Sequence, residues 1–214
     1  MVASGAVAGV FVTIEGIDRS GKSTQARRLA EALGDEALLV REPGGTPAGE
    51  RIRDLLKDPA IELDARSEAL LFAAARAELV ASVIRPALEA GKVVISDRYL
   101  DSSLAYQGHA RGLGEAEVRL VNEWATAGLE PDLTILLRLD PVTAGARAGE
   151  ADRFEDEGLA LQRRVADAYE RLAAADPRRW KALDAARDEE AVAADVRALV
   201  AEARAASAAS GAPA

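Results

Sequence analysis

The chain of 214 residues has no cysteine and one histidine, His109. It therefore has no disulfide, no thiol nucleophile and no Cys-zinc or multi-histidine metal site. Aromatic residues make up only 4% of the sequence, so the core must consist mostly of alanine, leucine and valine. No apolar run reaches the ~18 residues of a membrane span, and no basic signal-peptide region is present. We therefore expect a cytoplasmic protein that makes no membrane contact.

Lysine is also scarce, since the 27 basic residues include only four lysines against 23 arginines. The 36 acidic residues give a formal net charge of −9. A protein that binds a nucleic-acid polymer normally presents a basic face, so such a partner is not expected. The acidic total does not exclude a local basic pocket for a small anion.

Short β-branched runs alternate with longer helical patterns along the chain. We expect strands at residues 10–14, 37–40, 92–96, 133–139 and 180–184. We expect helices at residues 22–33, 48–57, 66–90, 115–127, 158–175 and 189–206. This alternation predicts an α/β fold with a parallel sheet flanked by helices. Ligands bind beyond the carboxyl ends of such strands, so the residues after each strand are candidates for a site.

The length suits a single domain over residues 1–214. We expect its core at residues 10–203. A charged, glycine-containing segment at about residues 141–156 has the composition of a closing lid. The Ala/Ser/Gly/Pro-rich end, residues 205–214, is expected to be loose.

The strongest motif follows the first expected strand and reads G-x-x-x-x-G-K-S from Gly16 to Ser23. Its glycines let the backbone N–H groups point at phosphate oxygens, and the following helix adds its positive end. Lys22 can reach the β- and γ-phosphates, and the Ser23 hydroxyl can ligate Mg²⁺. Arg19, inside the loop, could offset charge on a transferring phosphoryl group. The sequence therefore predicts a nucleotide site.

A second charged step, Asp97-Arg98, ends the third expected strand. Asp97 is placed to help hold Mg²⁺, and Arg98 could grip a second phosphate with two hydrogen bonds; a plain ion pair would also explain them. The following segment, 101–108, has polar and aromatic side chains that could contact a base edge. By itself this segment reads as a loop.

Two further features could serve a nucleotide. Phe72 and Arg76 are four residues apart in the long helix and share one face, so they could stack on and hydrogen-bond a nucleobase; a core Phe with a surface Arg is the alternative. Arg147 and Arg153 lie in the expected lid and could deliver positive charge when it closes.

Together these motifs resemble the bacterial thymidylate kinases in order and spacing. The resemblance runs from about residue 10 to 200, and the joint occurrence of the motifs makes it specific. The segments that carry it are Gly16–Ser23, Arg41–Thr46, Leu71–Arg76, Asp97–Tyr99 and Ser102–Gly108.

The resemblance implies a five-stranded, three-layer P-loop NTPase fold and a homodimer. It also implies transfer of the ATP γ-phosphoryl group to dTMP with Mg²⁺, giving dTDP and ADP in dTTP biosynthesis. The implied ATP-binding residues are Gly16, Ile17, Asp18, Arg19, Ser20, Gly21, Lys22, Ser23, Thr24 and Arg147. The implied metal residues are Ser23 and Asp97.

The same resemblance assigns a dTMP site. Phe72 would stack on thymine, and Arg76 would hydrogen-bond the edge of the base. Arg98 would bind the dTMP phosphate, and Tyr106 would pack against the deoxyribose. The remaining members are Ser103 and Gln107 at the base or phosphate side, and Glu42 and Arg53 lining the acceptor site.

The implied catalytic residues are Lys22, Arg98, Asp18 near the 3′-hydroxyl or the Mg²⁺ shell, and an arginine. Family members tend to place that arginine either in the phosphate loop or in the lid. This chain carries Arg19 in the loop as well as Arg147 and Arg153 in the lid. Our hypothesis is that Arg153 contributes most, because it lies in an Asp-Arg-Phe-Glu step that matches the bacterial lid.

Two alternatives remain at this point. One is a related P-loop kinase that acts on another nucleotide or on a deoxynucleoside, because these residues cannot separate thymine from uracil. The other is a nucleotide-dependent switch or binding protein. The chain lacks the N-K-x-D guanine motif of GTP switches, and Lys22, Ser23, Asp97 and Arg98 argue against a protein without turnover.

Overall fold

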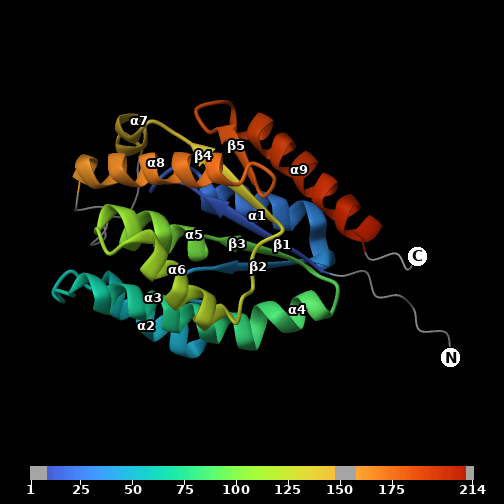
Figure 1. The fold of residues 1–214 in the computed structure, drawn as a ribbon. Helices are drawn as coiled ribbons and strands as arrows, with labels where there is room; N and C mark the ends of the chain where they lie inside the picture. The colour runs from blue at the N-terminus through green and yellow to red at the C-terminus, as the bar shows by residue number, and fades with distance from the viewer. Residues whose placement is uncertain (1–8, 148–157, 211–214) are drawn as a thin grey trace.

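The computed structural model describes residues 9–147 and 158–210. Its sheet has five parallel strands in the order β2-β3-β1-β4-β5 (Figure 1). This confirms the expected α/β sheet. The strands are β1 (Val10–Glu15), β2 (Ala37–Arg41), β3 (Val93–Asp97), β4 (Leu133–Arg138) and β5 (Trp180–Asp184).

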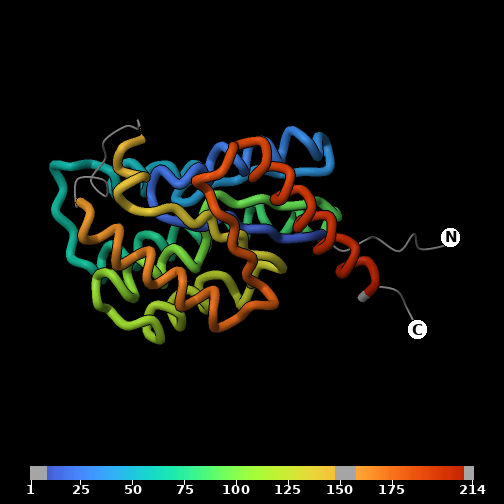
Figure 2. The backbone as a smooth tube through the Cα atoms, turned by 90° about the horizontal axis from the view of Figure 1, so that it is seen from above, coloured from blue at the N-terminus to red at the C-terminus, as the bar shows by residue number. Residues whose placement is uncertain are grey.

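Helices cover both faces of the sheet and make three layers. Helices α1 and α9 lie together on one side, and α8 lies on the other (Figure 2). The helices in the described ranges are α1 (Lys22–Leu33), α2 (Pro47–Lys57), α3 (Ala65–Leu79), α4 (Arg85–Glu89), α5 (Leu100–Ser103), α6 (Glu115–Thr126), α7 (Pro141–Gly145), α8 (Gly158–Ala175) and α9 (Glu189–Ser210). None of these helices is long and apolar enough to cross a membrane.

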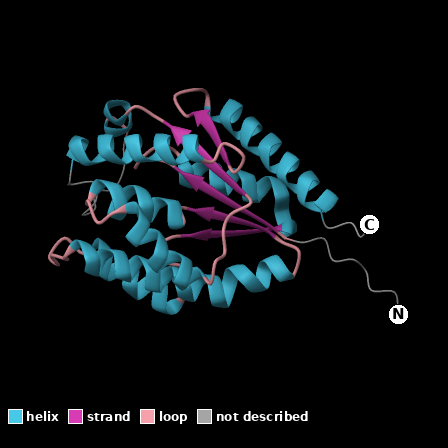
Figure 3. Ribbon diagram, in the orientation of Figure 1, coloured by secondary structure: helices cyan, strands magenta, loops and turns pink. Residues whose placement is uncertain are grey.

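Strand β1 occupies the centre of the sheet, and four of its six side chains are apolar. All six of its residues are buried, as expected for a strand that is covered on both faces. Val12 pairs with Ile95 of β3 on one side and with Leu133 of β4 on the other. The arrowheads of all strands point to the same edge, so the segments that follow them meet there (Figure 3).

The long helix expected at residues 66–90 is helical throughout but not uniform. A π-helical turn at Val80–Ile84 separates α3 from α4, and the N–H of Arg85 bonds to the carbonyl of Val80. Pro86 follows directly, and its ring has no N–H and crowds the preceding turn. The wider turn accommodates this proline without ending the helix.

Three segments contain more helix than the sequence analysis expected. Residues 101–108 are helical, in α5 and a π-helical segment Leu104–Ala110, because burial between α6 and α8 orders a segment with no clear periodicity. The expected lid begins with a short helix, α7, whose N-cap Asp140 accepts from the N–H of Thr143. The expected loose tail is helical as far as Ser210, since alanine is the strongest helix former.

Candidate active site

The phosphate loop joins β1 to α1 and is shaped by its two glycines. Gly16 and Gly21 have φ values of 146° and 100°, which side chains rarely tolerate. A Cβ on Gly16 would lie 2.7 Å from the carbonyl oxygen of Leu137. Lys22 donates to the carbonyl of Ile17 at 2.6 Å. Burial and the charge of Arg98 lower the pKa of Lys22 to about 8, so an incoming anion would favour its charged form.

Ser23 and Asp97 meet beside this loop, as the sequence predicts for a metal site. The Ser23 hydroxyl donates to the Asp97 carboxylate at 2.5 Å. Mg²⁺ commonly takes one or two such oxygens and completes its shell with water and substrate phosphates. No cluster of three or more His, Asp or Glu side chains suited to a metal occurs among the described residues. The pair therefore fits a metal that arrives with a nucleotide rather than one held by protein alone.

Arg98 stands at the carboxyl end of β3 in a left-handed conformation, with φ of 72°. Such a φ in a non-glycine residue is typical of functional positions. Its guanidinium pairs with Asp18 and donates to the carbonyl of Gly16 at 3.2 Å. Tyr106 donates to the other Asp18 oxygen at 3.0 Å. Burial opposes the charge on Asp18, but Arg98 and Lys22 outweigh it and lower the pKa of Asp18.

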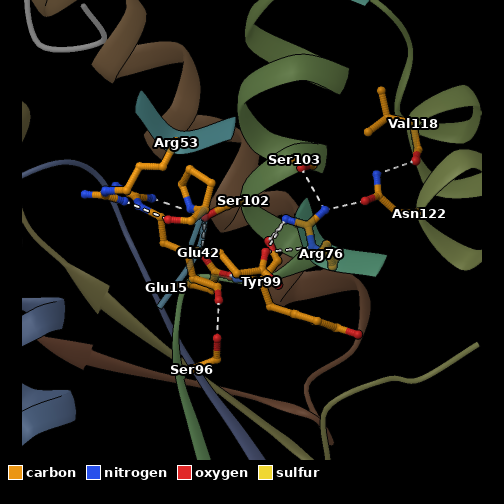
Figure 4. Close-up of polar contacts among 12 residues, drawn as sticks. Glu15, Glu42, Arg53, Arg76, Ser96, Tyr99, Ser102, Ser103, Val118 and Asn122 are labelled. Carbon is orange, nitrogen blue, oxygen red and sulfur yellow. Dashed lines mark hydrogen bonds and ion pairs between the residues drawn. The ribbon is translucent and has the colours of Figure 1, made fainter. Parts of the chain in front are cut away.

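Arg76 is only 1% exposed and connects α3 to three other segments (Figure 4). It pairs with Glu42 at 2.6 Å and donates to Ser103 at 3.1 Å. It also donates to the carbonyl of Tyr99 and to the amide oxygen of Asn122. Burial raises the pKa of Glu42 although Arg76 opposes the rise. The guanidinium is thus held rigidly at the wall of the adjoining cavity.

A cavity of about 790 Å³ opens beside these residues and brings the predicted acceptor site together. Asp18, Lys22, Ser23 and Asp97 line one part of it. All eight residues predicted for dTMP line it as well, namely Glu42, Arg53, Phe72, Arg76, Arg98, Ser103, Tyr106 and Gln107. Segments from five parts of the sequence therefore converge on one space, continuous with the phosphate loop.

A second cavity, of about 430 Å³, lies on the other side of the phosphate loop. Seven predicted ATP-binding residues line it: Arg19, Ser20, Gly21, Lys22, Ser23, Thr24 and Arg147. Ala185 and Arg187, from the turn between β5 and α9, also form part of its wall. The sequence analysis missed these two residues, although their position after a strand of the parallel sheet was a usable signal.

Arg19 and Arg147 hold each other in place at this second cavity. Arg19 donates to the carbonyl of Arg147 at 3.1 Å, and Arg147 donates to the carbonyl of Arg19 at 3.2 Å. Arg147 also donates to the carbonyl of Ala185 at 2.9 Å. Arg153, the other predicted lid arginine, lies outside the described residues.

Four buried or half-buried polar residues behind the site were not singled out from the sequence. Glu15 accepts from Ser102 at 2.6 Å and from Tyr169 at 2.8 Å. Gln162 of α8 accepts from the N–H of Asp18 at 3.2 Å and donates to its carboxylate at 2.7 Å. A carboxylate at the end of a buried strand could have marked Glu15. Ser102 lies in the segment 102–108 that the sequence analysis named without giving this residue a role, and no local signal marks Gln162 or Tyr169.

One family model matches residues 14–196, and it describes thymidylate kinase. This range covers most of the chain, including the phosphate loop and the cavity. The chain belongs to the thymidylate kinase family. Members of this family are enzymes that use ATP to phosphorylate dTMP to dTDP, so the predicted family, fold and enzyme class are confirmed.

Individual relatives agree over nearly the full length. The chain is 46% identical over 200 residues to a thymidylate kinase from Deinococcus radiodurans, covering 91% of this chain and 97% of the relative. It is 51% identical over 199 residues to one from Symbiobacterium thermophilum, covering 90% and 93%. The crystal structure of a thymidylate kinase from Ehrlichia chaffeensis matches with a TM-score of 0.76 at 32% identity, covering 90% of this chain and 98% of that one.

The buried carboxyl of Glu15 makes stability depend on pH. Burial, with the charge of Asp101, raises the pKa of Glu15 from 4.5 to about 7. The folded state therefore holds this proton more tightly than the unfolded state, and ionisation costs stability as pH rises from about 4.5 to 7. Glu15→Gln removes that cost, so we expect its stability relative to the unmodified protein to rise over this range by up to about 3 kcal/mol.

Urea unfolding at pH 5, 6, 7 and 8 measures this difference. Glu78→Gln is the matched control, because Glu78 is exposed on α3 and loses the same charge. A stability difference between Glu15→Gln and the unmodified protein that stays constant across the four pH values would contradict the prediction.

Proposed function

We propose that this chain transfers the γ-phosphoryl group of ATP to the 5′-phosphate of dTMP in the cavity described above. The observation that carries the proposal is the shared cavity, in which the phosphate loop and all eight predicted dTMP residues face one space. Its size suits a mononucleotide, because ligand pockets commonly measure ~300–1,000 Å³. ATP as donor agrees with the cytoplasmic location expected from the sequence.

The donor would bind along the phosphate loop, from Gly16 to Thr24, with the backbone N–H groups around its phosphates. Lys22 would contact the β- and γ-phosphates. Ser23 and Asp97 would hold Mg²⁺, which would neutralise charge on the transferring group. Ala185, Arg187 and Arg147 would line the remainder of the ATP site.

The acceptor is a phosphate oxygen that is already anionic, so no general base is needed. Catalysis then consists of positioning two crowded phosphates and neutralising their charge. Arg98 would bind the dTMP phosphate, and Asp18, now paired with Arg98, would turn towards the 3′-hydroxyl or the metal shell. Phe72 would stack on thymine, with Tyr106 against the deoxyribose.

The base edge would meet Arg76, Ser103 and Gln107. Glu42 and Arg53 would complete the acceptor site. Glu42 already fixes Arg76 through a buried ion pair, and Arg53 donates to the carbonyl of Pro43 at 2.9 Å. Both side chains would therefore need little rearrangement to accept the ligand.

ADP release with ATP and Mg²⁺ tests this function directly. We expect rapid release with dTMP, slower release with dUMP, and little with dCMP, dGMP, AMP or thymidine. Thymidine lacks the acceptor phosphate, so it separates a nucleotide kinase from a nucleoside kinase. Release at the background rate with dTMP would end the proposal.

We further propose that Arg153 supplies most of the positive charge that neutralises the transferring phosphoryl group. The geometry of Arg19 and Arg147 supports this, because both guanidinium groups donate to backbone carbonyls beside the loop. We expect Arg153→Ala to lower kcat by about a hundredfold or more and Arg19→Ala to lower it less. Single-turnover kinetics at saturating ATP compare the two variants. A larger loss for Arg19→Ala would overturn this assignment.

We also propose a homodimer that is formed through α3 and α6. Leu120 and Trp124, four residues apart on α6, are 67% and 87% exposed, and Leu70 on α3 is 57% exposed. Such large exposed apolar side chains mark interaction surfaces. We expect a dimer in light scattering and a shift to monomer in Trp124→Glu. Leu159→Glu, on α8, is the matched control, and a monomeric unmodified protein would contradict the proposal.

A further inference from the structure

Behind Gln107, which lines the large cavity, lies a buried carboxylate, Glu68, that the proposed function does not use. Glu68 lies on α3 and is 1% exposed. Arg111 donates to both of its oxygens, at 3.1 Å and 3.0 Å. The side-chain amide of Gln107 donates to the same carboxylate at 2.9 Å. A buried, paired charge is thus joined directly to a residue of the predicted base site.

This contact decides which way the Gln107 amide faces. Both Glu68 oxygens act as hydrogen-bond acceptors, because Arg111 donates to each of them. Gln107 must therefore present its NH₂ group to Glu68, since the reverse orientation would bring two acceptors together. Its amide oxygen then points away from Glu68, and the side chain itself lines the cavity.

Helix α3 carries Glu68 together with two residues of the predicted base site, Phe72 and Arg76. Glu68, Phe72 and Arg76 follow one another at intervals of four, so they lie on one helical face. Phe72, Arg76 and Gln107 line the same cavity. A nucleobase stacked on Phe72 would thus meet a donor, the Arg76 guanidinium, and an acceptor, the Gln107 oxygen.

We propose that Glu68, paired with Arg111, is a specificity-determining positioning residue that makes Gln107 present an acceptor to the nucleobase. The proposal rests on the proposed function, because it takes this cavity to hold the base of dTMP. Thymine and uracil offer an imide N–H beside a carbonyl oxygen, which matches this acceptor and donor. Cytosine offers an unprotonated ring nitrogen beside an amino group, so both contacts would be mismatched.

The choice between nucleobases that Glu68 would impose has a defined limit. Thymine and uracil present the same imide edge and differ only at the ring carbon that bears the methyl group. Glu68 therefore separates imide bases from cytosine, and it contributes nothing to the choice of dTMP over dUMP. A residue that only stabilised the fold would weaken the binding of all three nucleotides alike.

Glu68→Gln tests this role, because it keeps the volume of the side chain while removing the charge that orients Gln107. Glu78→Gln, an exposed position on the same helix, is the matched control. Calorimetry gives the dissociation constants of dTMP, dUMP and dCMP, and steady-state kinetics give kcat and KM. We expect the affinities for dTMP and dUMP to fall together by about tenfold, which is the effect of one lost hydrogen bond. We expect dCMP to change little, and the loss to appear in KM rather than kcat.

A double-mutant cycle establishes that Glu68 acts through Gln107. In a Gln107→Met background, Glu68→Gln should leave the dTMP-to-dCMP ratio unchanged. If Glu68→Gln does not fold, Arg111→Gln replaces it, because Arg111 is partly exposed and its loss frees the carboxylate to turn away from Gln107. We expect this variant to lower the same ratio.

An equal loss of affinity for all three nucleotides, or an unchanged ratio of the dTMP and dCMP affinities, would overturn the inference. Binding separates this failure from failure of the proposed function. An unmodified protein that binds dTMP over dCMP but releases no ADP would refute the kinase activity alone. One that phosphorylates dTMP while Glu68→Gln leaves the ratio intact would refute the role of Glu68 alone.

Discussion

The pairing of buried arginine with carboxylate from a distant segment is the constraint on which this site depends. Three arginines in or beside the acceptor cavity are fully or largely buried, and each would be costly to bury without a partner. Each has one, and each partner comes from another part of the sequence. The pairs are Arg76 with Glu42, Arg98 with Asp18, and Arg111 with Glu68. These pairs hold the three arginines in place in the structure without a ligand.

This pairing also reconciles an acidic protein with an anionic substrate. The net charge of −9 describes the whole surface, whereas the cavity gathers Lys22, Arg53, Arg76 and Arg98. Arg76 and Arg98 have carboxylate partners, while Lys22 and Arg53 donate to backbone carbonyls. The field inside the cavity can thus differ in sign from that of the surface. Long polyanions would meet the surface, while a mononucleotide reaches the pocket.

The sequence alone was sufficient for prediction wherever the residues that act together are also close together in the chain. The phosphate loop could be predicted because its glycines, Lys22 and Ser23 are close together in the chain, and the sheet because short strand-like runs alternate with longer helical patterns. The roles of Gln162 and Glu68 could not be predicted, because each contacts a partner more than thirty residues away. Residues 101–108 escaped prediction for a similar reason, since burial by neighbouring helices, rather than periodicity, makes them helical.

Helix α6 has a buried face and an exposed face. Residues only two positions apart in the sequence lie on these different faces. Asn122, which is buried, accepts from Arg76 at the base end of the cavity. Leu120 and Trp124, on either side of it in sequence, face outward. Whatever covers that outer face would press on the helix that carries Asn122 and, through it, on Arg76. In the proposed dimer, a contact on the outer face of α6 would therefore reach Arg76 through Asn122, and the assembly would help to set how firmly the proposed base site is held.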